Sequence, residues 1–165
     1  MRPHHRELLV HIVGGVAVLG SYAWGAMQPA ASGLWGRLPE AAIAPYTAMM
    51  PLAAIGYLLT MARSLQRSAH GEPSWAPTFA MILAASTAWL PLCILDLASP
   101  TRAGWWAIEI DLLTTAAGAL VIAKALWTED ATTRLAKAAR WGWIAFCIQT
   151  VVLDALIWPQ FFGVL

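Results

Sequence analysis

APTFAMILAASTAWLPLCILDL, residues 76–97, is an apolar run that contains a single charged side chain, Asp96. A helix of about 20 apolar residues is long enough to cross the roughly 30 Å hydrocarbon core of a bilayer. The run is therefore predicted to be a transmembrane helix. Pro91 lies in its second half and removes a backbone donor, which a membrane helix tolerates because neighbouring helices satisfy the freed carbonyl group.

Four further apolar runs flank this one, and each has the length of one membrane crossing. They cover residues 8–27, 43–65, 105–127 and 141–158. The segment from Pro29 to Pro39 contains Gly and Ser and is predicted to be a loop between the first two runs. Five crossings with short connections use the whole length. We therefore predict one domain over residues 1–165, an all-α integral membrane protein built as a bundle of five transmembrane helices.

Composition agrees with a membrane protein and argues against several other classes. Hydrophobic residues make up 59% of the chain and charged residues only 12%, where soluble domains carry about 25% charged residues. The net charge is +1 and basic residues form no run, so nucleic acid is not expected as a partner. Cys93 and Cys147 lie inside apolar runs, where they are expected to pack as small hydrophobic residues rather than to form disulfides or a metal site.

The ends of the predicted spans carry the markers of membrane interfaces. Tryptophan is enriched at the headgroup level, and six of the ten tryptophans lie at span ends: Trp75, Trp105, Trp106, Trp127, Trp141 and Trp158. Basic residues favour the cytoplasmic side. One side has Arg2, Arg6, Arg63, Arg67, Lys124, Arg134, Lys137 and Arg140, and the other has only Arg37 and Arg102. We expect a bacterial inner membrane protein with its N-terminus in the cytoplasm and its C-terminus outside.

Four acidic residues fall in the predicted non-cytoplasmic half of the bundle, where ionisable groups are costly and mark candidate functional sites. They are Asp96, Glu109, Asp111 and Asp154, of which Asp154 lies deepest. Glu109 and Asp111 are separated by about 200° around a helix, so they cannot both face one cavity. Both also suit the first turns of a helix near the headgroups. For Asp154, a hydrogen bond to a neighbouring helix and a ligand or proton site remain alternatives.

Other polar and small residues give weaker indications. His11 is expected to lie near the cytoplasmic interface without a ligand role, because bis-histidine haem needs a second intramembrane histidine. Small residues recur every four positions, which favours close helix packing within the chain or a homodimer interface. These residues are Ala17, Ser21 and Gly25 in one span and Thr115, Ala119 and Ala123 in another. No nucleophile, phosphate loop or metal-ligand motif supports enzyme activity.

Two short motifs in the second half of the chain are Trp89-Leu90-Pro91 and Gly104-Trp105. They resemble motifs of the TspO translocator family, the tryptophan-rich sensory or peripheral benzodiazepine receptor proteins. The first is similar to the W-x-P of the family's third helix, and the second to the start of its fourth. The segments at residues 143–146 and 33–39 resemble its fifth helix and its first loop. Ser86 stands where the family has Asn. Five spans and ten tryptophans agree with this resemblance.

The resemblance implies a pocket beneath the first loop, which acts as a lid, and flat hydrophobic ligands such as porphyrins, haem or sterols, with no required cofactor. By the matching motifs the lid includes Trp35 and Pro39, and the lining includes Trp89, Trp105, Trp143, Phe146, Cys147 and Thr150. A four-residue spacing adds Asp154 to the stripe of Phe146 and Thr150. Pro91 lies on the same side of the membrane.

The sequence leaves three functions open. The leading hypothesis is a membrane receptor or carrier for a planar hydrophobic ligand, whose pocket has aromatic walls and a few polar groups. The second is a small proton-coupled transporter in which Asp154 and Glu109 titrate. The third is a structural subunit of a larger membrane complex, without any pocket.

Overall fold

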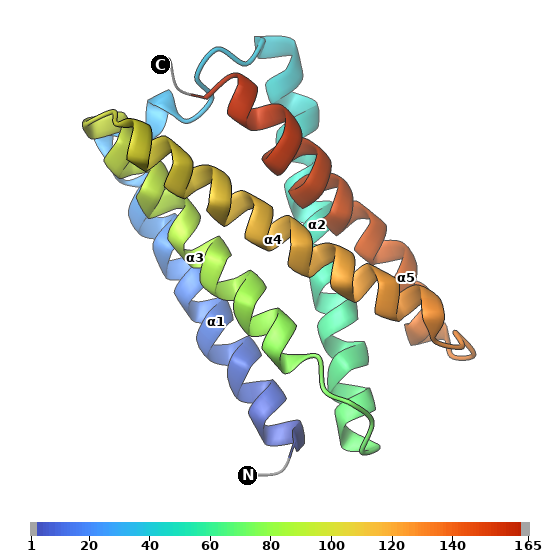
Figure 1. Cartoon of the computed structure of the whole chain (residues 1–165). Helices are drawn as coiled ribbons and strands as arrows, with labels where there is room; N and C mark the ends of the chain where they lie inside the picture. The colour runs from blue at the N-terminus through green and yellow to red at the C-terminus, as the bar shows by residue number, and fades with distance from the viewer. Residues whose placement is uncertain (1–2, 163–165) are drawn as a thin grey trace.

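The computed structural model describes residues 3–162, which fold into five long helices with no strand in that range (Figure 1). All five are long and apolar enough to cross a membrane, which confirms the prediction of an all-α five-helix bundle and indicates an integral membrane protein. The helices are α1 (Pro3–Ala26), α2 (Glu40–Ala69), α3 (Ala76–Ala98), α4 (Arg102–Thr128) and α5 (Arg134–Cys147). A π-helical segment η2 (Ile148–Ile157) and a 3₁₀ turn η3 (Trp158–Gln160) continue α5, and η1 (Pro29–Gly33) lies in the first loop.

The five helices form a closed ring in the order α1, α2, α5, α4, α3. Successive helices run in opposite directions, so the described ends of the chain lie at opposite ends of the bundle (Figure 1). One end contains the start of α1 and the loops at residues 70–75 and 129–133, together with all the described residues of the larger basic group. We call it the basic end and the other the opposite end. Arg2, also predicted on this side, lies outside the described residues.

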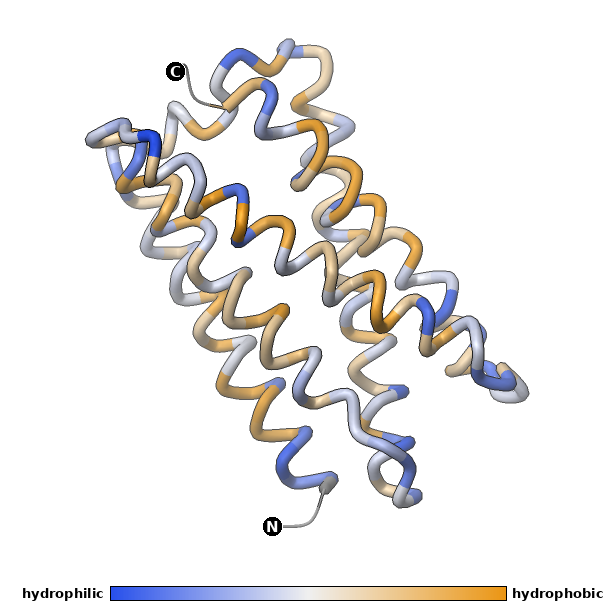
Figure 2. The backbone as a smooth tube through the Cα atoms, in the orientation of Figure 1, coloured by the Kyte–Doolittle hydropathy of each residue, from blue (hydrophilic) through white to orange (hydrophobic). Residues whose placement is uncertain are grey.

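The outer surface of the ring is apolar over the middle of the bundle. Val16, Leu19 and Met27 of the first helix and its following turn are 68%, 72% and 74% exposed. Figure 2 shows apolar residues along the middle of the helices and most hydrophilic residues towards their ends. Water would solvate such a surface poorly, whereas lipid chains match it. The exposed side chains therefore point in the direction expected for lipid contact.

Proline residues inside α2 and α3 do not end these helices. Pro45 and Pro51 lie within α2 and Pro91 within α3, as the sequence predicts. The Thr87 hydroxyl, one turn before Pro91, donates to the Leu83 carbonyl at 2.7 Å. Pro45 and Pro51 both lie on the exposed side of α2, whereas Pro91 is half-buried.

Glycine allows the closest contacts between helices. A Cβ atom at Gly56 of α2 would lie 2.0 Å from the carbonyl oxygen of Gly142 of α5, so the two backbones touch at this crossing. A Cβ atom at Gly25 would similarly meet Leu90 of α3 at 2.3 Å. Gly25 belongs to one predicted small-residue stripe, and Ala119 of the other accepts a hydrogen bond from Trp143. At these positions the stripes serve packing within the chain.

Candidate ligand-binding site

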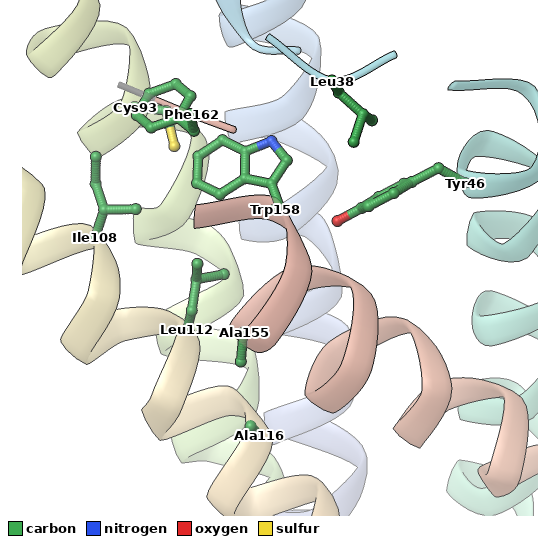
Figure 3. Close-up of a cluster of buried hydrophobic side chains, with 9 residues drawn as sticks. All are labelled: Leu38, Tyr46, Cys93, Ile108, Leu112, Ala116, Ala155, Trp158 and Phe162. Carbon is green, nitrogen blue, oxygen red and sulfur yellow. The ribbon is translucent and has the colours of Figure 1, made fainter. Parts of the chain in front are cut away.

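A cluster of aromatic and aliphatic side chains fills the space between the five helices near the opposite end of the bundle. We call it the upper cluster (Figure 3). The Trp158 ring lies near its centre, stacks on Phe162 with ring centroids 4.0 Å apart, and meets Trp89 of α3 edge-on at 5.6 Å. Its buried members are Leu38, Tyr46, Cys93, Ile108, Leu112, Ala116, Ala155, Trp158 and Phe162. Side chains from α2, α3, α4, the first loop and the C-terminal segment thus converge on one place.

Asp154 carries the polar contacts at the edge of the upper cluster. Its Oδ1 accepts a hydrogen bond from the Tyr46 hydroxyl and a second from Gln149 Nε2, the latter at 2.8 Å. Figure 3 shows the Tyr46 hydroxyl pointing from α2 towards the C-terminal helix. Asp154 is half-buried. A carboxyl group among apolar side chains needs such donors, because an unpaired polar group in this environment is costly. Asp154 therefore joins α2 to η2.

The π-helical geometry of η2 brings Gln149 and Asp154 together. In an α-helix, residues five apart point about 140° away from each other, whereas the i→i+5 hydrogen bonds of a π-helix stack them on one face. Both residues lie within Ile148–Ile157. Runs of π-helix are rare and frequently occur at functional sites. The α-helical spacing expected from the sequence would pair Asp154 with Thr150 instead. The Thr150 hydroxyl donates to the Phe146 carbonyl at 2.9 Å.

The first loop covers the upper cluster and is attached to the end of the chain. The Trp158 indole N–H donates to the Leu34 carbonyl and the Arg37 amide donates to the Phe161 carbonyl, both at 2.9 Å. Trp35 meets the Tyr46 ring edge-on, with centroids 5.3 Å apart. The first loop and the C-terminal segment are therefore held together at this end of the bundle.

Three buried polar atoms around the upper cluster have no hydrogen-bond partner. They are the indole nitrogen of Trp89, Oε1 of Gln149 and Oδ2 of Asp111. Trp89 packs against the cluster, Gln149 contacts it through Asp154, and Asp111 precedes its member Leu112. Buried polar groups in native proteins are nearly always paired, so three orphans in one region need an explanation. One donor and two acceptors are available there to a polar molecule.

The residues predicted to bind ligand divide between two places. Trp35, Trp89 and Asp154 meet at the upper cluster. Trp143 and Phe146 stack on each other at 4.3 Å in a second cluster nearer the basic end, against which Cys147 also packs. Trp143 is 1% exposed and its N–H donates to the Ala119 carbonyl at 2.8 Å. The indole N–H of Trp143 therefore already has a hydrogen-bond partner.

Other candidates from the sequence are not among the side chains of the upper cluster. Pro39 is exposed at the start of α2, and Trp105 forms an edge-on pair with Trp106. Asp96 accepts a hydrogen bond from the Thr101 amide at 3.1 Å, which fixes the turn between α3 and α4. Glu109 is half-buried on α4. Pro91 is half-buried two residues after Trp89.

A buried polar cluster in α1 was missed by the sequence analysis. Glu7 is fully buried and accepts hydrogen bonds from the hydroxyls of Ser64 and Ser74. His11, one turn further, is 5% exposed, and its Nδ1 lies 2.7 Å from the Tyr57 hydroxyl. His11 is thus buried inside the bundle. Glu7 and His11 are four residues apart and so share one face of the helix, and this spacing could have predicted the cluster.

Two surface cavities lie away from the upper cluster. A polar pocket of about 410 Å³ at the basic end lies beside an ion-pair network in which Glu129 binds Arg63 and Arg67. An apolar groove of about 330 Å³ runs between α4 and α5 and includes Trp143 and Cys147. Neither cavity is lined by residues of the first loop.

Comparison with known proteins gives no relative from which the role of the site could be inferred. No family model, no curated protein and no solved structure matches the chain. Among residues 3–162 no group of three or more His, Cys, Asp or Glu side chains is placed to hold a metal ion. The upper cluster offers aromatic surfaces, a carboxylate with two donors, and three unpaired polar atoms.

Proposed function

We propose that the protein is a membrane receptor or carrier of the TspO type, which binds a flat hydrophobic ligand at the upper cluster beneath the first loop. The ligand class is a porphyrin or other tetrapyrrole, or a sterol-like compound. The supporting observation is the set of three unpaired polar atoms on Trp89, Gln149 and Asp111 around an aromatic cluster. Small-molecule sites combine mainly aromatic walls with a few placed polar groups.

The polar atoms favour a ligand with both donors and acceptors. The Trp89 indole offers an N–H, whereas the free oxygens of Gln149 and Asp111 accept hydrogen bonds. A tetrapyrrole has ring N–H donors and carboxylate acceptors on a flat apolar framework. Rings such as Trp89 and Trp158, which meet edge-on at 5.6 Å, would separate to admit it. The first loop, which is hydrogen-bonded to the C-terminal segment, would cover this entry.

The test is a titration of tryptophan fluorescence with protoporphyrin IX on the purified full chain. We expect quenching in the low micromolar range for the unchanged protein and an affinity about tenfold lower for Trp89→Phe, which loses a buried hydrogen bond and aromatic surface. Trp24→Phe is the matched control, because Trp24 lies on the outer surface of α1 and is 41% exposed. Retained binding in Trp89→Phe with loss in a folded Trp143→Phe variant would contradict the proposed position.

The charge distribution supports a proposed orientation. The basic end would face the cytoplasm of a bacterial cell, with the first loop and the upper cluster on the non-cytoplasmic side. A ligand would then enter from outside or from the outer leaflet. The proposal includes a homodimer. Gly25, one of the small residues considered for its interface, packs against Leu90 within the chain.

A second candidate function is proton-coupled transport, and the buried acids favour it. Asp154 near the opposite end and Glu7 near the basic end each lie inside the ring, hydrogen-bonded to hydroxyl groups. Intramembrane acids commonly mark ion or proton pathways. Glu109, the partner expected from the sequence, is half-buried, whereas Glu7 is fully buried.

A further inference from the structure

The apolar groove between α4 and the last helix opens sideways from the bundle. Leu120 on one wall is 53% exposed and Val152 on the other is 42% exposed, so the groove faces the surroundings and not the ring interior. It has a volume of about 330 Å³. Its lining is Leu120, Ala123, Trp127, Trp143, Ile144, Cys147, Ile148, Val151 and Val152. Because these residues belong to predicted membrane spans, lipid chains are the molecules that surround the groove.

Two lysines lie on the same helix faces as the groove, at its end nearest the basic end of the bundle. Lys124 lies between Leu120 and Trp127, four residues from one and three from the other, so the three share a face of α4. Lys137 precedes Ile144 by seven residues, which is two turns along one face of α5. Both lysines are exposed. The ion pairs among the described residues all involve Arg63 or Arg67.

Aromatic and basic side chains place this end of the groove at the headgroup level. Trp127 and Trp141 form an edge-on pair 5.9 Å apart, as expected at a membrane interface. Arg140 lies over the Trp127 ring at 4.9 Å, but its guanidinium already donates to the carbonyls of Leu126 and Glu129. Lys124 and Lys137 therefore remain as charges that an anionic headgroup can neutralise.

We propose that this groove is a binding site for an anionic phospholipid. One acyl chain lies in the groove, and the phosphate contacts the ammonium groups of Lys124 and Lys137. The lining from Trp127 to Leu120 extends about 10 Å along α4, a length suited to the upper part of an acyl chain. Basic pockets between membrane helices bind acidic headgroups, and each lysine near the surface adds to the attraction. None of the buried residues of the upper cluster lines the groove, although Val151 lines the groove and also packs against that cluster.

Native mass spectrometry of the full chain in detergent tests this proposal. The protein is titrated with dioleoyl phosphatidylglycerol and, in parallel, with dioleoyl phosphatidylcholine, which has the same chains without net charge. We expect one tightly retained phosphatidylglycerol and about tenfold weaker retention of phosphatidylcholine. The double variant Lys124→Gln/Lys137→Gln should lose this preference, and Ala123→Phe, which fills the groove, should weaken retention of both lipids.

Arg102→Gln is the matched control, because Arg102 is an exposed cation at the opposite end. It should retain the preference for phosphatidylglycerol in full. Equal retention of the two lipids by the unchanged protein would overturn the proposal. So would a preference that survives in the double lysine variant, or displacement of phosphatidylglycerol by inorganic phosphate at equal concentration, which would indicate a site for the free anion.

Discussion

Gly56→Ala is expected to lower the free energy of unfolding by about 1–3 kcal/mol, the usual cost of overpacking a well-packed contact. The added methyl group would lie 2.0 Å from the carbonyl oxygen of Gly142. That oxygen belongs to the backbone, so no side chain can turn aside and the two helices must separate. Since α2 and α5 have the most extensive contact in the ring, separation at this point disturbs the whole bundle. Thermal unfolding in detergent, followed by tryptophan fluorescence, measures the effect.

Two other glycines provide a graded comparison. A Cβ atom at Gly142 would meet Gly56 Cα at 3.0 Å, so Gly142→Ala should destabilise less than Gly56→Ala. At Gly20 of α1 nothing lies within 4 Å, and Ala is the better helix former by about 0.5–1 kcal/mol. Gly20→Ala should therefore be neutral or slightly stabilising. Equal effects of all three substitutions would mean that α2 and α5 do not meet through their backbones.

Gly36→Ala is expected to release the first loop from the C-terminal segment. Gly36 has a φ of +51°, a conformation that costs other residues about 1–2 kcal/mol, and its Cβ would lie 2.1 Å from the Phe161 carbonyl oxygen. The same oxygen accepts the Arg37 amide, so that hydrogen bond should break. Hydrogen exchange at residues 34–38 and 158–162 should become about tenfold faster, measured by mass spectrometry.

Gly71→Ala is the control that separates backbone strain from collision. Gly71 also has a positive φ, +77°, but nothing lies within 4 Å of its Cβ position. It should speed exchange only in the loop at residues 70–75. If Gly36→Ala left exchange at residues 158–162 unchanged, the attachment between the loop and the C-terminal segment would be contradicted.

Hydropathy was sufficient to predict the helices but not where their side chains meet. Every predicted span overlaps a helix, because transfer of apolar residues into lipid depends on composition summed along the run. Helix ends differ by several residues: the last helix begins at Arg134 and not at residue 141. Polar residues can continue a helix into the headgroup region, where hydropathy no longer distinguishes helix from loop.

Some residues of the candidate site were predictable from the sequence and others were not, and the difference has a specific physical cause. Trp89 and Asp154 were both identified, one by motif and the other as a buried acid. Gln149 was missed because only the π-helical hydrogen bonding of η2 aligns it with Asp154. Tyr46 was missed as a partner of Asp154 because their contact joins residues far apart in the sequence. No periodicity within one helix reveals such a pair.

The most direct test of the proposed ligand site is nuclear magnetic resonance of the indole N–H groups in protein labelled with ¹⁵N-tryptophan, with and without protoporphyrin IX. Without ligand the Trp89 N–H has no hydrogen-bond partner, whereas the Trp143 N–H donates to Ala119 at 2.8 Å. Trp89→Phe and Trp143→Phe variants assign the two signals. We predict that the ligand shifts the Trp89 signal and leaves the Trp143 signal in place. A shift of Trp143 with Trp89 unchanged would contradict a ligand site at the upper cluster.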